Sequence, residues 1–157
     1  MARVTHVKKA RKDYPEAGIK AGEPYYWWAF RYGGKHKSKT CPRASQLTQS
    51  PFLSQAYSLD ERAQDASEDA HLPDLIYELT GEWRELGDEC QGSLDNMPDS
   101  LQDSESGQLL QERIDKCEEI AGELESIDVE LEGLAESELD EKYVDILQQL
   151  QNTDFSV

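Results

Sequence analysis

The sequence predicts an α+β fold: a small N-terminal antiparallel β-hairpin or three-stranded sheet, followed by an acidic antiparallel helical hairpin or bundle. Residues 1–57 carry 11 Lys and Arg against 3 Asp and Glu, a formal charge of +8. Residues 58–157 carry 5 against 30, a formal charge of −25. From Leu72 onward the apolar residues also change from alternate positions to steps of three and four. Together these changes indicate two modules of opposite charge.

The first module is expected to be β-rich because aromatic strand formers fill residues 24–32. After the Gly33-Gly34 pair, basic and small polar residues alternate over residues 35–40, which predicts a hairpin. An earlier strand is expected over residues 3–9, which would complete a three-stranded sheet.

A helix should end this module. Ser45 or Thr48 could cap a helix that reaches to about Ala63. Because proline is tolerated at the first helical position, Pro51 favours a start at Ser50. Residues 58–71 are expected to form a linker or a short helix.

The register of the hairpin decides which side chains share a face. A two-residue turn at Gly33-Gly34 is favoured because both central positions of such a turn need positive φ. It would interleave the lysines of the second strand with Trp28 and Phe30 on one face. A three-residue loop would shift the pairing by one and put the lysines on a face with Trp27.

Either register suits a polyanion, since lysines neutralise phosphates and exposed aromatic rings stack on bases. A second basic cluster lies near the amino terminus. The alternative interpretation is that the aromatic residues form the core of a small domain and the lysines its solvated rim. The candidate nucleic-acid-binding residues are Lys8, Lys9, Arg11, Lys12, Trp28, Arg31, Lys35, Lys37, Lys39 and Arg43.

The stretch Tyr26–Lys35, continued by Ser38-Lys39-Thr40, resembles the arm-binding domain of tyrosine-recombinase integrases. In that family a three-stranded sheet lies on DNA and a helix packs behind it. The likeness covers about a quarter of the chain, and the recombinase catalytic domain has no counterpart in it. The resemblance implies no catalysis. It implies DNA contact by Arg31, Lys35, Lys37 and Lys39.

The chain as a whole also resembles small uncharacterised proteins from bacteriophages and bacteria. The segments that carry this likeness are residues 10–15, 45–50 and 95–98. The resemblance implies no known activity, but it implies a setting in a contest between phage and host.

Residues 72–157 are expected to form an acidic helical bundle with a heptad seam. The seam breaks near Pro98 and resumes at Leu110, which predicts two antiparallel helices, and a final short helix should follow around residues 139–150. A hairpin buries only one face of each helix, so a third helix or a second chain should complete it. The seam residues expected to mediate assembly are Leu79, Trp83, Leu86, Leu110, Ile114, Leu124, Ile127 and Leu131.

Several classes of function are disfavoured. No apolar run is long enough to span a membrane, and no signal peptide is evident. The three cysteines are widely spaced without a CxxC pair, which favours a reducing, cytoplasmic setting. His6, His36, Cys41 and His71 lack metal-site spacing, and no phosphate loop or nucleophile elbow is present. We expect no metal, no cofactor and no enzymatic activity.

The sequence therefore predicts a non-catalytic interaction protein. Its basic β module would bind nucleic acid or an acidic surface, and its acidic helices would mediate assembly, including a homodimer, or contact with a host protein. The alternative is a phage-encoded inhibitor of a host defence or DNA-processing enzyme, with acidic helices that mimic DNA. A scaffold subunit in a larger particle is a third class.

Overall fold

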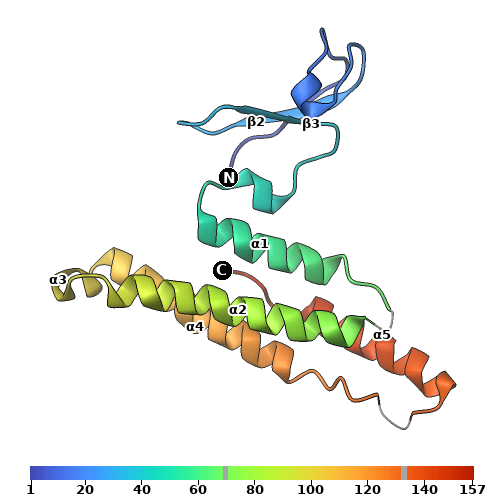
Figure 1. Ribbon diagram of the computed structural model, residues 1–157, viewed down its shortest axis with the longest axis vertical. Coiled ribbons are helices and arrows are strands. Elements are labelled where there is room, and N and C mark those ends of the chain that lie inside the picture. The colour runs from blue at the N-terminus through green and yellow to red at the C-terminus, as the bar shows by residue number, and fades with distance from the viewer. Residues whose placement is uncertain (69–70, 132–133) are drawn as a thin grey trace. The chain divides into compact units, whose positions relative to one another are not determined.

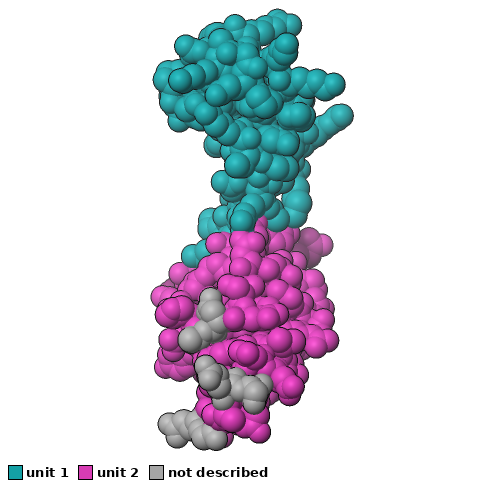
Figure 2. All heavy atoms as spheres, turned by 90° about the vertical axis from the view of Figure 1, so that its right-hand side faces the viewer, with its two compact units in different colours: residues 1–55 teal, residues 56–157 magenta. Residues whose placement is uncertain are grey.

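The computed structural model describes residues 1–68, 71–131 and 134–157. The chain forms two compact units, unit 1 (residues 1–55) and unit 2 (residues 56–157), coloured separately in Figure 2. The predicted α+β class is confirmed, because a three-stranded antiparallel sheet is followed by several helices (Figure 1).

The sheet of unit 1 consists of β1 (Thr5–Val7), β2 (Tyr25–Ala29) and β3 (Lys35–Ser38), in the order β1-β2-β3. Each strand lies within the range that the sequence predicts. Both pairings are antiparallel, with His6 opposite Tyr26 and Trp28 opposite His36. Short 3-10 helices, η1 (Pro15–Ala17) and η2 (Ala44–Leu47), lie in the connections.

The predicted two-residue turn at Gly33-Gly34 is wrong. β2 ends at Ala29 and β3 begins at Lys35, so residues 30–34 form the connection. Neither glycine has positive φ, and the Gly33 amide donates to the Phe30 carbonyl oxygen at 3.3 Å. The chain therefore turns two residues earlier, around residues 31–32, and the lysines share a face with Trp27. The same two faces were expected for the alternative three-residue loop that the sequence left open.

The aromatic residues of β2 are divided between the two faces of the sheet. On the face that bears Trp27, Tyr25 is buried in a cluster with Ala10 and Ile19 from the connection before β2. On the other face, Trp28 is only 5% exposed and stacks on His36, with ring centroids 5.4 Å apart. The cluster around Tyr25 therefore forms the described core on the first face, and Trp28 is buried on the second.

The boundary between the units falls inside α1 (Pro51–Gln64), two residues before the predicted boundary at residue 57. The predicted start of this helix is confirmed, since Pro51 is its first residue and the Ser50 hydroxyl accepts from the Leu53 amide. Residues 58–64 of the expected linker are thus helical, and residues 69–70 lie outside the described residues.

In unit 2, helices α2 (Leu72–Asp95) and α4 (Glu105–Glu125) pack side by side as the predicted hairpin (Figure 1). The short helix α3 (Asp99–Gln102) lies in the polar connection between them. Helix α5 (Glu136–Asn152) contacts α2 and supplies the third helix that the hairpin needed.

The seam residues that were expected to mediate assembly are covered by other parts of the same chain. Six of the eight residues are buried, and Leu110 and Leu131 are half-buried. Ile127 and Leu131 also lie beyond the end of α4 at Glu125, so the second seam helix is shorter than predicted. The buried residues are Leu79, Trp83, Leu86, Ile114, Leu124 and Ile127.

Trp83 lies at the centre of this core, with no exposed surface. Its ring stacks on Phe155, which follows α5, with centroids 6.0 Å apart and planes 19° apart. The segment after the last helix thus packs into the core of unit 2, and the large Trp83 side chain is accommodated without a second copy of the chain.

Candidate nucleic-acid interface

The lysines of β3 lie on the face of the sheet that also bears Trp27. Strand pairing places Lys37 opposite Trp27 and Lys35 opposite Ala29. Because residues opposite each other in a ladder share a face, the two ammonium groups project from the same side of the sheet. The Lys35 ammonium lies over the ring of Trp27, 5.2 Å from its centroid.

Tyr14 brings a third lysine to the same place. The Lys37 ammonium lies 4.4 Å from the centroid of the Tyr14 ring, and the Lys12 ammonium lies 5.7 Å from it. Lys12 comes from the connection between β1 and β2, and Lys37 comes from β3. Three cations from two segments that are distant in sequence are thereby gathered around two aromatic rings.

A hollow of about 450 Å³ opens at this cluster. We call it the Tyr14 hollow. Its lining combines three lysines, one histidine and two carboxylates with the edge of η1. The lining residues are Lys12, Asp13, Tyr14, Pro15, Glu16, Ala17, Lys35, His36 and Lys37.

Main-chain hydrogen bonds hold the wall of the hollow in place. The Tyr14 amide donates to the Ile19 carbonyl oxygen at 2.8 Å, and Gly18 closes η1 at a φ of 65°. The Ala10 amide donates to the Glu23 carbonyl oxygen at 2.8 Å. The buried Ile19 anchors the loop to the core, so the loop that carries Tyr14 is fixed at both ends.

The two carboxylates of the lining differ in their surroundings. The Asp13 Oδ1 atom accepts a 2.6 Å hydrogen bond from the Ala21 amide, so this carboxylate closes the loop. Glu16 lies exposed on η1, at the side of the hollow. Both carboxylates reduce the positive charge that the three lysines create.

The structure contradicts the predicted role of Trp28. Its ring is buried in unit 1 and therefore is not exposed for stacking on a base. Lys39 is on the surface but forms an ion pair with Glu23 at 3.1 Å, so part of its charge is already neutralised. This pairing and a hydrogen bond from the Lys20 amide lower the pKa of the Glu23 carboxyl, with the amide as the larger cause.

The other predicted residues are distributed around the unit. Arg31 lies over the ring of Tyr32 at the hairpin tip, 5.4 Å from its centroid, and Tyr32 is 87% exposed. Four further predicted residues are exposed but do not line the Tyr14 hollow: Lys8, Lys9, Arg11 and Arg43.

Sequence reasoning missed Tyr14 as a residue that holds the lysines, and it placed Trp27 beside them only in the alternative register. The adjacency of Lys12 and Tyr14 was the available signal, but nothing in their spacing shows that β3 passes beside them. The contact depends on the path of the connection between β1 and β2.

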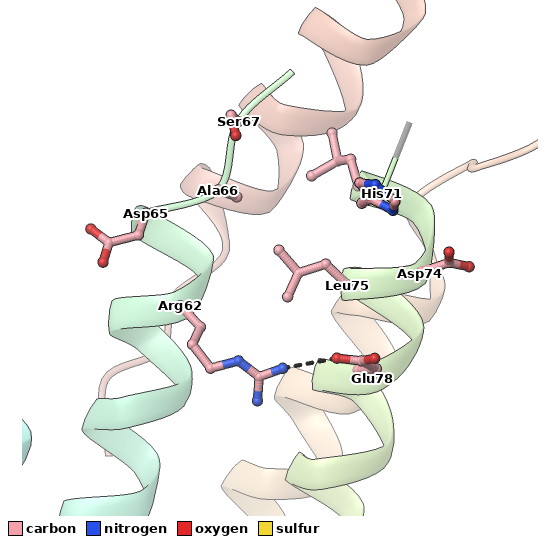
Figure 3. A pocket seen from close by; sticks show the side chains of 9 residues that line it. Arg62, Asp65, Ala66, Ser67, His71, Asp74, Leu75 and Glu78 are labelled. Atoms are coloured by element: carbon pink, nitrogen blue, oxygen red, sulfur yellow. Dashed lines mark hydrogen bonds and ion pairs between the residues drawn. The ribbon is translucent and has the colours of Figure 1, made fainter. Parts of the chain in front are cut away.

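Unit 2 contains a second polar hollow, of about 480 Å³, between the end of α1 and the start of α2. In Figure 3, Arg62 and Leu75 point into it, whereas Asp65 and Asp74 point away. The Arg62 guanidinium pairs with Glu78 at 3.1 Å and also with Glu82, so its charge is balanced within the unit. This hollow is therefore a poor site for an anion.

Among the described residues, no group of three His, Cys, Asp or Glu side chains could hold a metal ion. None of the helices in the described parts of the chain combines the length and apolar character needed to cross a bilayer.

In comparisons with protein families, curated proteins and solved structures, no match to this chain is found. The fold and the site therefore define it as a two-unit α+β protein with a basic β module and an acidic helical unit.

Proposed function

We propose that unit 1 is a nucleic-acid-binding module. The observation that carries this proposal is the gathering of Lys12, Lys35 and Lys37 around Tyr14 and Trp27 on one face of the sheet. The unit has 11 Lys and Arg against 3 Asp and Glu, so the surrounding surface is also cationic. Binding requires no chemistry from the chain. It neutralises phosphates and releases their counterions.

A cytoplasmic setting fits this proposal. All three cysteines are free, with Cys41 exposed and Cys90 and Cys117 buried, as expected for a reducing compartment.

The test is a titration of labelled DNA with the full chain at several salt concentrations. We expect binding at low salt, with the logarithm of the affinity falling linearly as the logarithm of the salt concentration rises. The three lysines around Tyr14 and Trp27 should contribute about −2 to this slope on single-stranded DNA. Absence of binding at low salt, or an affinity that does not depend on salt, would contradict the proposal.

A second candidate function concerns unit 2, which we propose as a mimic of DNA that occupies the cleft of a DNA-binding host enzyme. Unit 2 carries 30 Asp and Glu against 5 Lys and Arg, so the ion pairs inside the unit can neutralise only a small part of its negative charge, which supports a strongly acidic surface. Four basic residues whose carboxylate partners lie within the unit illustrate this. These residues are Arg62, Arg84, Lys116 and Lys142. The test is whether the immobilised full chain captures a DNA-binding enzyme, and whether added duplex DNA then releases that enzyme from the chain. If DNA fails to compete, the captured enzyme is not held at its DNA cleft and this candidate is rejected.

A further inference from the structure

We propose that the Tyr14 hollow binds the phosphate groups of the nucleic-acid backbone and does not contact the bases. This inference rests on the proposed function of unit 1 and specifies which atoms of the ligand are recognised. It replaces the expectation that aromatic residues of this module stack on bases.

The first argument is the state of the aromatic rings. The Lys37 and Lys12 ammonium groups lie 4.4 and 5.7 Å from the centroid of Tyr14, and the Lys35 ammonium lies 5.2 Å from that of Trp27. A cation near a ring face is held by the ring quadrupole and takes space that a stacking base would need. The rings therefore position cations.

The core side of Tyr14 is also occupied. The ring of Tyr25 lies behind it, with centroids 5.5 Å apart and planes 51° apart, and Tyr25 belongs to the buried cluster of unit 1. Tyr14 thus connects the core to the lysines. A base that stacked on Tyr14 would have to displace Lys37 or Tyr25.

The second argument is that the cations are already arranged before a ligand arrives. Free lysine side chains lose rotamer freedom when they bind an anion, which weakens binding. Here Lys37 is half-buried against Tyr14, and the loop that carries Tyr14 is fixed by the Tyr14–Ile19 and Ala10–Glu23 main-chain hydrogen bonds. A phosphate placed between the lysines would meet groups whose freedom is already restricted.

The third argument concerns the carboxylates of the hollow. Asp13 is engaged by the Ala21 amide, whereas Glu16 lies exposed at the side of the hollow. A phosphate site predicts that Glu16 repels the ligand. Glu16→Gln should therefore strengthen binding, and it should do so by the same factor whether or not the ligand carries bases.

The main experiment compares two triple variants of the full chain that lose the same charge. One variant, K12Q/K35Q/K37Q, empties the Tyr14 hollow of lysines. The matched control, K8Q/K9Q/K20Q, removes three exposed lysines that do not line it. The probes are a single-stranded oligothymidylate and an abasic oligomer of equal length, which keeps the phosphates and lacks the bases.

We expect the hollow variant to bind oligothymidylate at least about tenfold more weakly than the native chain, with a salt slope shallower by about 2. The control variant should lose clearly less. The loss caused by the hollow variant should be the same on the abasic probe, because the phosphates are unchanged. Circular dichroism spectra of both variants check that the fold is kept.

Two results would overturn the inference while the proposed function survives. Equal losses in the two variants would mean that binding is diffuse attraction to the whole basic unit. A loss that nearly disappears on the abasic probe would mean that the hollow contacts bases. If the native chain binds neither probe at low salt, the proposed function itself fails, so the two failures are distinguishable.

Discussion

Cys41 and Cys117 show how strongly position alone changes the chemistry of one residue type. Cys41 is exposed after β3, whereas Cys117 lies in the α2–α4 core with no exposed surface. Burial, and secondarily the neighbouring Cys90, raise the pKa of the Cys117 thiol from 9.0 to about 12. Burial also raises the pKa of Cys90. Because the thiolate is the nucleophile, these two thiols should be inert in the folded chain.

We predict that a thiol-specific reagent modifies one cysteine rapidly in the native protein and the other two only when denaturant unfolds unit 2. Cys41→Ser should abolish the rapid phase, and it serves as the control for the assignment. Rapid modification of two or three thiols in the native protein would contradict the burial of Cys90 and Cys117.

The raised pKa of Cys117 also determines how the stability of the fold changes at alkaline pH. In the unfolded chain the thiol ionises near 9.0, whereas in the folded chain it stays protonated until about 12. The contribution of this thiol to stability is therefore fully present below pH 9 and is lost as the pH rises towards 12.

At the scale of the element, α4 contains two glycines in opposite surroundings. A Cβ atom at Gly107, near the start of the helix, would lie 1.9 Å from the main-chain oxygen of Gln102 in α3. A Cβ atom at Gly122, near the end of the helix, would meet nothing within 4 Å. Gly107 is therefore required by the close approach of α3, while Gly122 only weakens the helix.

We predict that Gly107→Ala lowers the free energy of unfolding by about 1–3 kcal/mol, because main chain must move to relieve the overlap. Gly122→Ala on the same helix should raise it by about 0.5–1 kcal/mol, because alanine loses less conformational freedom on folding. Urea unfolding followed by the helical circular dichroism signal measures both changes. Equal effects of the two substitutions would contradict the contact between α3 and α4.

At the scale of the whole molecule, the chain joins a unit of charge +8 to a unit with 5 Lys and Arg and 30 Asp and Glu. The apolar seam of the acidic unit is filled by its own helices and by Phe155. Two copies that met through their acidic units would repel each other. The seam residues are already buried within each copy and so could not form the interface.

We therefore predict a monomer of 17.8 kDa in sedimentation equilibrium, at low salt and at physiological salt. Repulsion between acidic units is strongest at low salt, because exposed charges are screened over only about 8 Å at physiological ionic strength. A mass that rises towards twice this value with protein concentration would show that another surface mediates assembly.

Much of this organisation could be predicted from the amino-acid sequence. Charge composition alone placed a boundary at residue 57, two residues from the end of unit 1 at Gln55, and Ser50 with Pro51 identified the start of α1. These features depend on interactions between residues close in the chain, for which spacing and propensity are sufficient evidence.

The tertiary structure alone decided the register of the hairpin, the burial of Trp28 and the meeting of Lys12, Lys35 and Lys37 around Tyr14 and Trp27. A shift of one residue exchanges the two faces of a strand, so register follows from which face the rest of the unit covers. Here the connection before β2 covers one face with Ile19 and Tyr14. The sequence by itself determined how many cations the basic unit has, and long-range packing determined which of them act together.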